Sequence, residues 1–306
     1  MLSFQQMTYI LTLHEEGQFQ RASEKCFVTQ PTLSMQIKKA EEQLSQQIFN
    51  RLASPIELTE FGKELLPILQ DTLNDYDRIN ALKKSYIGSR KERIRIGIIP
   101  TVGIYLIPKM ISSISSKLPD CQIEFEELKS SELISSLENY KLDLIVMAGP
   151  FFDVKFKSIK LFEEEILIYC PNSQKEEFKL EDIQDLQPWL LSHGNCLRNQ
   201  MIEFCQIVNK DQNSILNYKG GNIEIVMSMV EQYGGYTLIP EFIPLPANQK
   251  KCLKKLVSGG VYPGREIIAA YPSRSYKAEY LKEIISIIKT YFLSVKDKNL
   301  EIIAWK

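Results

Sequence analysis

The sequence has few of the features that mark secreted, membrane-bound or disulfide-stabilised proteins. Six cysteines are spread over 306 residues, which is too sparse for a disulfide framework. No apolar run approaches the roughly 18 to 20 residues that a membrane-spanning helix needs. The first residues show no basic leader and no small-residue cleavage site. We therefore expect a soluble, cytoplasmic protein whose thiols are kept reduced, so that any disulfide is transient and functional.

The chain also lacks an excess of basic charge. Its formal net charge is −1, and residues 1–88 hold 9 Lys and Arg against 11 Asp and Glu. Overall charge thus gives no argument for a nucleic-acid partner, which only a local cluster of basic residues could indicate. The length exceeds that of one ordinary domain, so a small module beside a larger one is expected.

Apolar residues recur at helical spacing through the first fifty residues. They predict three helices, at about 4–16, 19–27 and 29–49. Thr29 is a suitable N-cap for the third helix, and Pro31 suits its first turn, where no backbone N–H is needed. The tight connection between the second and third helices is typical of a helix-turn-helix. Residues 51–58 indicate a small hairpin, which completes a winged helix-turn-helix domain over residues 1–58.

A long helix is predicted to follow, capped by Thr59 and forming a linker over residues 59–88. Its apolar positions form one seam, made of Leu65, Leu69, Leu73, Tyr76 and Ile79. A lone helix of about 28 residues cannot bury such a seam within a small module, so we expect it to pair with the same helix of a second copy. The basic, irregular segment 88–93 marks the boundary with the rest of the chain.

After residue 93 short β-branched runs alternate with helical runs. IRIGIIP, CQIEFEEL and LDLIVMAG indicate strands, with helices expected after Gly103 and at 130–140. This alternation predicts an α/β fold with an open parallel sheet. Further strands are expected at EEILIYC, PWLLS, GGYTLIP and EIIAAYP, and a last helix from Lys277 to Ser294.

The segment 18–39 is locally positive, because Arg21, Lys25, Lys38 and Lys39 stand against Glu24 alone. Polar side chains occupy the early turns of the predicted third helix, where helix N-termini attract phosphate and polar residues suit a major groove. The candidate DNA-binding residues in this segment are Arg21, Thr29, Gln30, Pro31, Thr32, Ser34, Gln36 and Lys38. Spacing alone leaves a solvated helical hairpin within a bundle open as the alternative.

The stretch AS…CFVTQPTLSMQIKKAEEQL…IFNR…ELTEFGKELLP resembles the N-terminal domain and linker helix of LysR-type transcriptional regulators. The resemblance implies a recognition helix from Thr29 to Leu44 and adds Arg51 to the DNA-binding candidates. The chain departs from the family at Ser54, where a basic residue is usual, so weaker DNA contacts of the wing are expected. The resemblance also implies a regulatory domain of periplasmic-binding-protein type, with these boundaries: 89–306 overall, subdomain I about 93–164 and 267–306, subdomain II about 165–266.

Cys196 and Cys205 flank a segment that could be helical. Nine residues of α-helix rise about 13.5 Å and turn through about 900°, which leaves the two side chains on opposite faces. A disulfide needs Cα atoms within about 7 Å, so bridging this pair requires the segment between them to be rebuilt. Spacing leaves two interpretations open, a redox switch and two unrelated buried thiols. A metal site is disfavoured, because this spacing with His193 nearby matches no usual zinc pattern.

The segment GNCLRNQMIEFC resembles the redox loop of the OxyR subfamily, the peroxide sensors among LysR-type regulators. GIIPTVGIYLIPKM (97–110) and YPGREI (262–267) resemble the beginning of the OxyR regulatory domain and its late arginine segment. The resemblance implies that hydrogen peroxide oxidises Cys196, that Cys205 resolves the product as a disulfide, and that antioxidant genes respond. The implied peroxide-binding residues are Thr101, Ser130, Asn195 and Arg265.

Two departures from the OxyR pattern concern the surroundings of the thiol. The histidine that commonly precedes the reactive cysteine is Asn195 here, and an expected aspartate is Asn199. Activation of Cys196 is therefore expected to depend on Arg265 and on the amides of a helix N-terminus, with Arg198 close in sequence and His193 as a partial substitute.

The resemblance also implies partners. They are a double-stranded DNA operator, RNA polymerase, a glutaredoxin-type or thioredoxin-type reductant, and further copies of the chain in a homodimer or homotetramer; no cofactor and no metal is expected. A LysR-type regulator that binds a small metabolite between the regulatory subdomains is the main alternative. A thiol peroxidase is a second, against which the helix-turn-helix argues.

Overall fold

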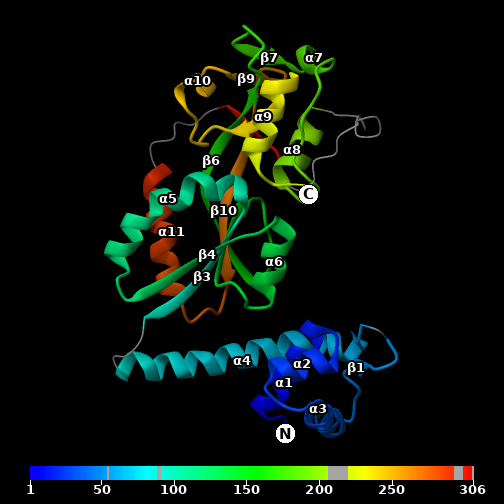
Figure 1. Ribbon diagram of the computed structural model, residues 1–306. Coiled ribbons are helices and arrows are strands. Elements are labelled where there is room, and N and C mark those ends of the chain that lie inside the picture. Colours follow the sequence, from blue (N-terminus) through cyan, green and yellow to red (C-terminus); the bar gives the residue numbers. More distant parts are fainter. Residues whose placement is uncertain (54, 88–90, 206–219, 293–298, 305–306) are drawn as a thin grey trace. The chain divides into compact units, whose positions relative to one another are not determined.

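The structure of the protein is a computed structural model (Figure 1), which describes residues 1–53, 55–87, 91–205, 220–292 and 299–304. The chain forms two compact units, Met1–Arg90 and Lys91–Lys306. The predicted linker helix lies within the first unit. Within the described ranges, no helix combines the length and the apolar character needed to cross a membrane.

The N-terminal unit consists of short helices, a small hairpin and one long helix (Figure 1). Their bounds are α1 (Phe4–Glu16), α2 (Phe19–Lys25), α3 (Gln30–Leu44), β1 (Phe49–Asn50), β2 (Glu57–Leu58) and α4 (Glu60–Ile87). Thr29 and Thr59 cap α3 and α4 as expected, because their hydroxyls accept the amides of Thr32 at 3.4 Å and Gly62 at 3.0 Å. The third helix ends earlier than predicted, since Ser45 adopts a left-handed backbone conformation with φ 54°.

The first half of α4 packs on the core of its own unit. Leu66 and Leu69 are buried there together with apolar residues of α1 and α3, and Leu65 packs against the same cluster. Tyr76 stacks on Phe4, with ring centroids 4.2 Å apart. Leu69 is therefore buried within its own unit and needs no second copy there, and Leu65 is partly covered, while pairing through the rest of the seam stays a prediction. The later seam residue Ile79 is 65% exposed, so the part of the seam that stays uncovered lies farther along α4.

The C-terminal unit is built on a mixed sheet with the strand order β4-β3-β5-β10-β6-β9-β7, in which β11 also pairs with β10 and β8 with β6. The strands are β3 (Glu92–Ile98), β4 (Cys121–Glu127), β5 (Leu144–Ala148), β6 (Phe156–Tyr169), β7 (Glu177–Lys179), β8 (Thr237–Pro240), β9 (Leu253–Val257), β10 (Tyr262–Pro272) and β11 (Leu300–Ile302). β3 runs parallel to β4 and β5, but β10 runs antiparallel to β5 and β6. The α/β class is confirmed, whereas the sheet is mixed and not purely parallel, because the long strand β10 returns beside β6.

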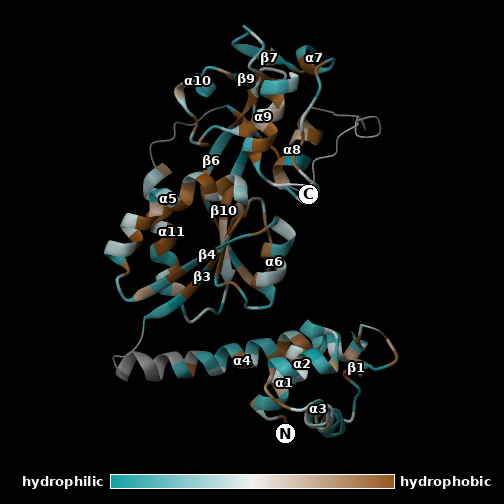
Figure 2. Cartoon of the chain, in the orientation of Figure 1, coloured by the Kyte–Doolittle hydropathy of each residue, from teal (hydrophilic) through white to brown (hydrophobic). Residues whose placement is uncertain are grey.

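Helices cover this sheet and supply much of its apolar packing (Figures 1 and 2). They are α5 (Pro100–Lys117), α6 (Ser130–Glu138), α7 (Leu180–Ile183), α8 (Cys196–Phe204), α9 (Ile223–Tyr233), α10 (Ala247–Lys250) and α11 (Ala278–Phe292). The helix expected after Gly103 begins earlier, because Pro100 already occupies its first turn. PWLLS forms no strand, since its pairing is limited to an isolated bridge between Pro188 and Tyr236 and its Leu191 is buried in the core.

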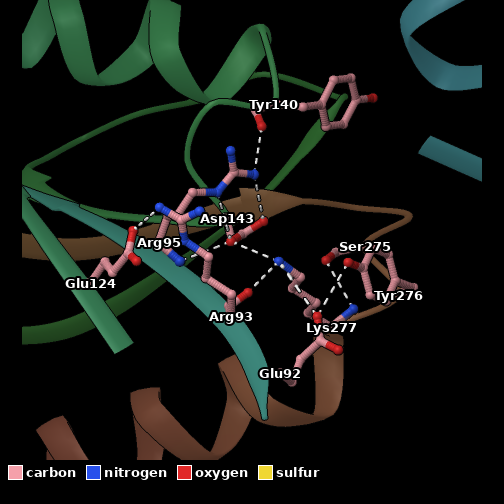
Figure 3. A network of polar contacts seen from close by, with 9 residues as sticks. All are labelled: Glu92, Arg93, Arg95, Glu124, Tyr140, Asp143, Ser275, Tyr276 and Lys277. Atoms are coloured by element: carbon pink, nitrogen blue, oxygen red, sulfur yellow. Dashed lines mark hydrogen bonds and ion pairs between the residues drawn. The ribbon is translucent and has the colours of Figure 1, made fainter. Parts of the chain in front are cut away.

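A polar network joins the first strand of this unit to its last helix (Figure 3). Asp143, directly before β5, accepts the backbone N–H of Arg95 at 2.8 Å and Lys277 Nζ at 2.9 Å. The same ammonium donates to the carbonyl of Arg93 at 2.6 Å. Because Lys277 is buried, these acceptors offset the cost of removing its charge from water. The network therefore ties together the start of β3, the turn before β5 and the start of α11.

Candidate redox site and DNA-binding surface

Arg265 lies at the centre of a buried polar cluster in the C-terminal unit. It belongs to β10 and is fully buried. Its Nε donates to Glu164 Oε1 at 2.8 Å, its Nη1 to Thr101 Oγ1 at 3.0 Å, and its Nη2 to the Thr101 carbonyl at 3.3 Å. The fold thus brings Arg265 together with Thr101, two of the residues expected to bind peroxide. The predicted subdomain boundaries at 164/165 and 266/267 fall within β6 and β10, beside this cluster.

Glu164 is a member of the cluster that sequence reasoning missed. Its Oε1 also accepts the Tyr105 hydroxyl at 2.9 Å, whereas Oε2 has no hydrogen-bond partner among the described residues. Burial raises the pKa of Glu164, and the charge of Arg265 and the hydrogen bond from Tyr105 only partly oppose that shift. The residue sits within the acidic triplet 163–165, which in a sequence indicates a solvated strand rather than a buried ion pair.

Cys196 is the first residue of α8 and is 4% exposed. Burial acts to lower the pKa of the Arg265 guanidinium. The negative charges of Glu164 and of a Cys196 thiolate act to raise it, and the net shift is upward. The thiol therefore lies within electrostatic range of Arg265. Asn195 occupies the N-cap position, and its amide donates to the Ser192 carbonyl at 3.2 Å and to Ser192 Oγ at 3.1 Å. That side chain consequently fixes the turn before Cys196.

Ser130 begins α6 and is buried, and its Oγ has no hydrogen-bond partner in the described part of the chain. The loop before Cys196 approaches the side chain of Lys129, the residue before Ser130, because a Cβ at Gly194 would lie 3.0 Å from Lys129 Cδ. Thr101, Ser130 and Cys196 each stand in the first turn of a helix. Unpaired amides and the positive end of the helix dipole favour negative charge at such positions. With Arg265, the arrangement can stabilise a thiolate and a small anionic leaving group.

Cys205 lies at the other end of α8, and both cysteines are free thiols. Burial raises the pKa of Cys205 to about 12, and a hydrogen bond with Tyr236 opposes that shift only in part. The segment between the cysteines is helical, as the sequence suggested, so they are about 13.5 Å apart along the axis. A disulfide cannot form in this conformation. Residues 206–219, which follow Cys205, lie outside the described residues.

Other residues near α8 have clear structural roles. Gln200, in the middle of α8, is fully buried and donates to the Ile303 carbonyl at 2.7 Å, so the helix is attached to the segment after β11. Arg198 donates to the Leu191 carbonyl at 2.9 Å. His193 is exposed to solvent. The Arg198 contact thus ties α8 to the segment before it, whereas His193 lies at the surface.

Most of the candidate DNA-binding residues lie on α3, whose buried face contributes Leu33 and Ile37 to the core, whereas Arg21 lies on α2 and Arg51 follows β1. Arg21, Thr29, Pro31, Lys38 and Arg51 are exposed, and Gln30, Thr32, Ser34 and Gln36 are partly exposed. Two of them also hold the unit together.

Those two residues are Gln36 and Arg51. Gln36 Oε1 accepts Gln6 Nε2 at 3.4 Å. Arg51 forms an ion pair with Glu41 at 2.7 Å, and its guanidinium lies 5.7 Å from the centroid of the Phe19 ring. Substituting either one would therefore change packing as well as any DNA contact. Ser54, the expected weak point of the wing, lies outside the described residues.

Comparison with known proteins matches both units. Residues 88–293 match the model of the LysR substrate binding domain, and residues 4–63 match that of the bacterial regulatory helix-turn-helix protein of the lysR family. The chain belongs to the LysR family. This LysR-family protein is a DNA-binding transcriptional regulator and not an enzyme.

Relatives of this regulator match it along nearly its whole length. The hydrogen peroxide-inducible genes activator of Haemophilus influenzae is 26% identical over 303 residues, which is 97% of this chain and 99% of that protein. A full-length OxyR variant from Pseudomonas aeruginosa has a TM-score of 0.72 at 24% identity and covers 94% of this chain and 95% of its own. A peroxide-bound OxyR variant from Corynebacterium glutamicum has a TM-score of 0.58 at 25% identity, with 95% and 92% covered.

Proposed function

We propose that this regulator senses hydrogen peroxide by oxidation of Cys196, and that a Cys196–Cys205 disulfide switches the expression of antioxidant genes. The observation that carries the proposal is a buried thiol at a helix N-terminus, within electrostatic range of Arg265, in a unit that also holds a buried hydroxyl without a partner among the described residues, Ser130 Oγ. A buried unpaired hydroxyl is costly, so a small polar ligand that pairs with it is favoured. The names of the relatives, a peroxide-inducible activator and OxyR, point the same way.

In the first step the Cys196 thiolate attacks one oxygen of hydrogen peroxide. An S–O bond forms, the O–O bond breaks, and hydroxide leaves with the electron pair, so that Cys196 becomes a sulfenic acid. Thr101 and Ser130 supply hydroxyls for the peroxide oxygens, and Arg265 stabilises the negative charge that develops on the departing oxygen. Asn195 contributes by fixing the turn that presents the sulfur.

In the second step Cys205 condenses with the sulfenic acid, an S–S bond forms, and water leaves. The raised pKa of Cys205 keeps it protonated in the reduced protein, so Cys196 is the thiol that meets peroxide first. Because the helix holds the sulfurs apart, α8 must unwind for the bridge to form. Unwinding breaks the Gln200–Ile303 hydrogen bond and exposes Phe204, which is buried in the reduced state. A thiol reductant of the glutaredoxin or thioredoxin type then resets the switch.

We propose that the unwinding of α8 changes DNA binding by altering the contacts between copies of the chain. Exposed apolar residues of α4, Ile68 and Ile79, offer one surface for a homodimer, and the regulatory units offer another for a homotetramer. A changed surface around α8 would alter the second interface and the spacing of the operator contacts. RNA polymerase is the partner that such a change would recruit or release.

Thiol mass spectrometry before and after brief exposure to micromolar peroxide tests the proposal. We expect a Cys196–Cys205 disulfide, with Cys26, Cys121 and Cys252 still free. Cys205→Ser should trap a sulfenic acid at Cys196 that a dimedone-type probe labels, while Cys196→Ser should react at neither position and still bind operator DNA. Cys121→Ser serves as a matched control and should behave as the native chain. A native chain that forms no 196–205 bridge would overturn the proposal.

One observation favours a second function, a small metabolite as the inducer. The C-terminal unit matches a substrate binding domain, and Ser130 Oγ and Glu164 Oε2, which have no partner among the described residues, suit a hydroxylated ligand as well as a peroxide. In that case operator binding should change with a metabolite while Cys196→Ser and Cys205→Ser respond as the native chain does.

A further inference from the structure

The buried ion pair between Glu164 and Arg265 points to a positioning residue that neither the sequence motifs nor the comparisons select. We propose that Glu164 holds the Arg265 guanidinium in place and shares its positive charge with Cys196, so that Glu164 limits how readily the thiol ionises. The inference deepens the proposed function, on which it rests for the role of Cys196.

The strand register places the two residues of the pair opposite each other. Arg265 of β10 and Glu164 of β6 are directly opposite each other in the antiparallel register, so their side chains leave the sheet on the same face. Both side chains are fully buried, and Arg265 Nε reaches Glu164 Oε1 at 2.8 Å. Removing two charges from water is tolerated only when each neutralises the other. Glu164 is therefore the fixed counter-ion of Arg265.

The hydrogen bonds also orient the guanidinium. Because Glu164 occupies Nε, the two Nη atoms point to Thr101 at the start of α5, where they make the contacts at 3.0 and 3.3 Å. Tyr105, one turn along the same helix, donates to Glu164 at 2.9 Å and holds the carboxylate from the other side. Removing the carboxylate would leave Nε without its acceptor and free the guanidinium to rotate.

The position of the Arg265–Glu164 pair also determines which charges act on Cys196. The ionisable groups that act on Glu164 and Arg265 come from α5 (Tyr105), β10 (Arg265), α8 (Cys196) and the turn after β8 (Glu241). Arg265 is the cation among them, and Glu164 and a Cys196 thiolate are anions that both interact with it. A carboxylate that already neutralises Arg265 leaves less attraction for the thiolate.

The substitution Glu164→Gln separates charge from shape, since an amide oxygen of nearly the same size can still accept from Arg265 Nε and from Tyr105. The readout is the rate at which iodoacetamide alkylates Cys196 in the full chain, without peroxide, across about pH 5 to 9, followed by mass spectrometry. We expect the midpoint of the rate-against-pH curve to move down by about one unit, which is about a tenfold higher rate on its acid side. Glu164→Asp retains the charge and should keep the native midpoint.

A matched control is Glu163→Gln, which removes the same charge one residue earlier on β6. Glu163 pairs with Lys160 and is partly exposed, and alternation along a strand directs its side chain to the opposite face. Its curve should coincide with the native one, and thermal unfolding should show that all variants fold.

Three outcomes would overturn the inference. They are an unchanged midpoint in Glu164→Gln, an upward shift, or an equal downward shift in Glu163→Gln. The test is independent of peroxide sensing: a downward shift in Glu164→Gln together with a native chain that forms no 196–205 disulfide would keep the charge sharing and remove the proposed function.

Discussion

The DNA-binding face and the thiol site differ in how their residues are brought together. The candidate DNA contacts lie largely in one continuous segment and are exposed or partly exposed around α3. The thiol site takes its residues from four elements and buries all of them: Thr101, Ser130, Cys196 and Arg265. Substitution on the DNA-binding face should therefore change affinity at little cost in stability. At the thiol site the side chains that we propose take part in the chemistry are also part of the core, so reactivity and stability should change together.

The largest expected effect is that of Arg265→Ala. It leaves Glu164 as a buried charge without its counter-ion, and breaking such a pair costs about 3 to 5 kcal/mol of unfolding free energy. Denaturant unfolding of the full chain measures the loss, and the peroxide-induced disulfide should disappear with it. Adding Glu164→Leu to Arg265→Ala should recover part of the stability but not the response, because the unpaired charge is gone and the cation is still missing. A stable Arg265→Ala chain would break the contrast between the two regions.

A slightly smaller effect is expected from Leu69→Glu. Leu69 is 3% exposed in the core of the N-terminal unit, so a carboxylate there should destabilise that unit by about 3 kcal/mol. Ile79→Glu is the matched comparison, because Ile79 is 65% exposed; it should leave thermal unfolding unchanged and weaken self-association, as sedimentation would show. If the Leu69→Glu chain is monomeric and its N-terminal unit stays folded, Leu69 belongs to the interface between copies and not to the core of its own unit.

The raised pKa of Cys205 predicts how stability depends on pH. Between about pH 8.5, where an unfolded cysteine ionises, and pH 12, where Cys205 ionises in the folded chain, the folded state retains a proton that the unfolded state loses. Stability contributed by this thiol is complete below that window and is lost as pH rises through it, by up to about 1.4 kcal/mol per unit. Cys205→Ala should flatten this part of the stability curve.

The smallest expected effect on stability belongs to the DNA-binding face. Lys38→Ala removes an exposed charge whose nearest acidic neighbour, Glu42, is 3.9 Å away, so unfolding should change by less than about 0.5 kcal/mol. Operator binding should nevertheless weaken for all sequences, with a salt slope reduced by about one.

Gln30→Ala should act differently from Lys38→Ala, because a side chain near base edges changes the preference among operator sequences. Binding to a panel of operator variants measures the preference. Equal losses on every operator for both variants would remove Gln30 from base reading and leave it as a phosphate contact.

The elements of the N-terminal unit could be read from the sequence because their signals are local. The capping residues Thr29 and Thr59 and the apolar spacing within each helix act over a few residues. Errors occurred where a turn without a clear sequence signal ends a helix, and where contacts between distant residues determine which side chains are buried. α3 ends at Leu44 because the chain turns at Ser45 into the hairpin, and Leu69 is buried because α4 folds back on the core of its own unit.

For the thiol site, the sequence by itself determined the pair of cysteines, the helix between them and the α/β class of the unit that carries them, since spacing and periodicity are properties of a single segment. Its resemblance to a known family supplied Thr101, Ser130 and Arg265 as candidates. Only the tertiary structure placed Glu164 opposite Arg265, attached Gln200 to Ile303 and left Ser130 Oγ unpaired. Strand register and burial depend on residues far apart in the chain, and they decide whether a glutamate is a solvated charge or the counter-ion of a buried arginine.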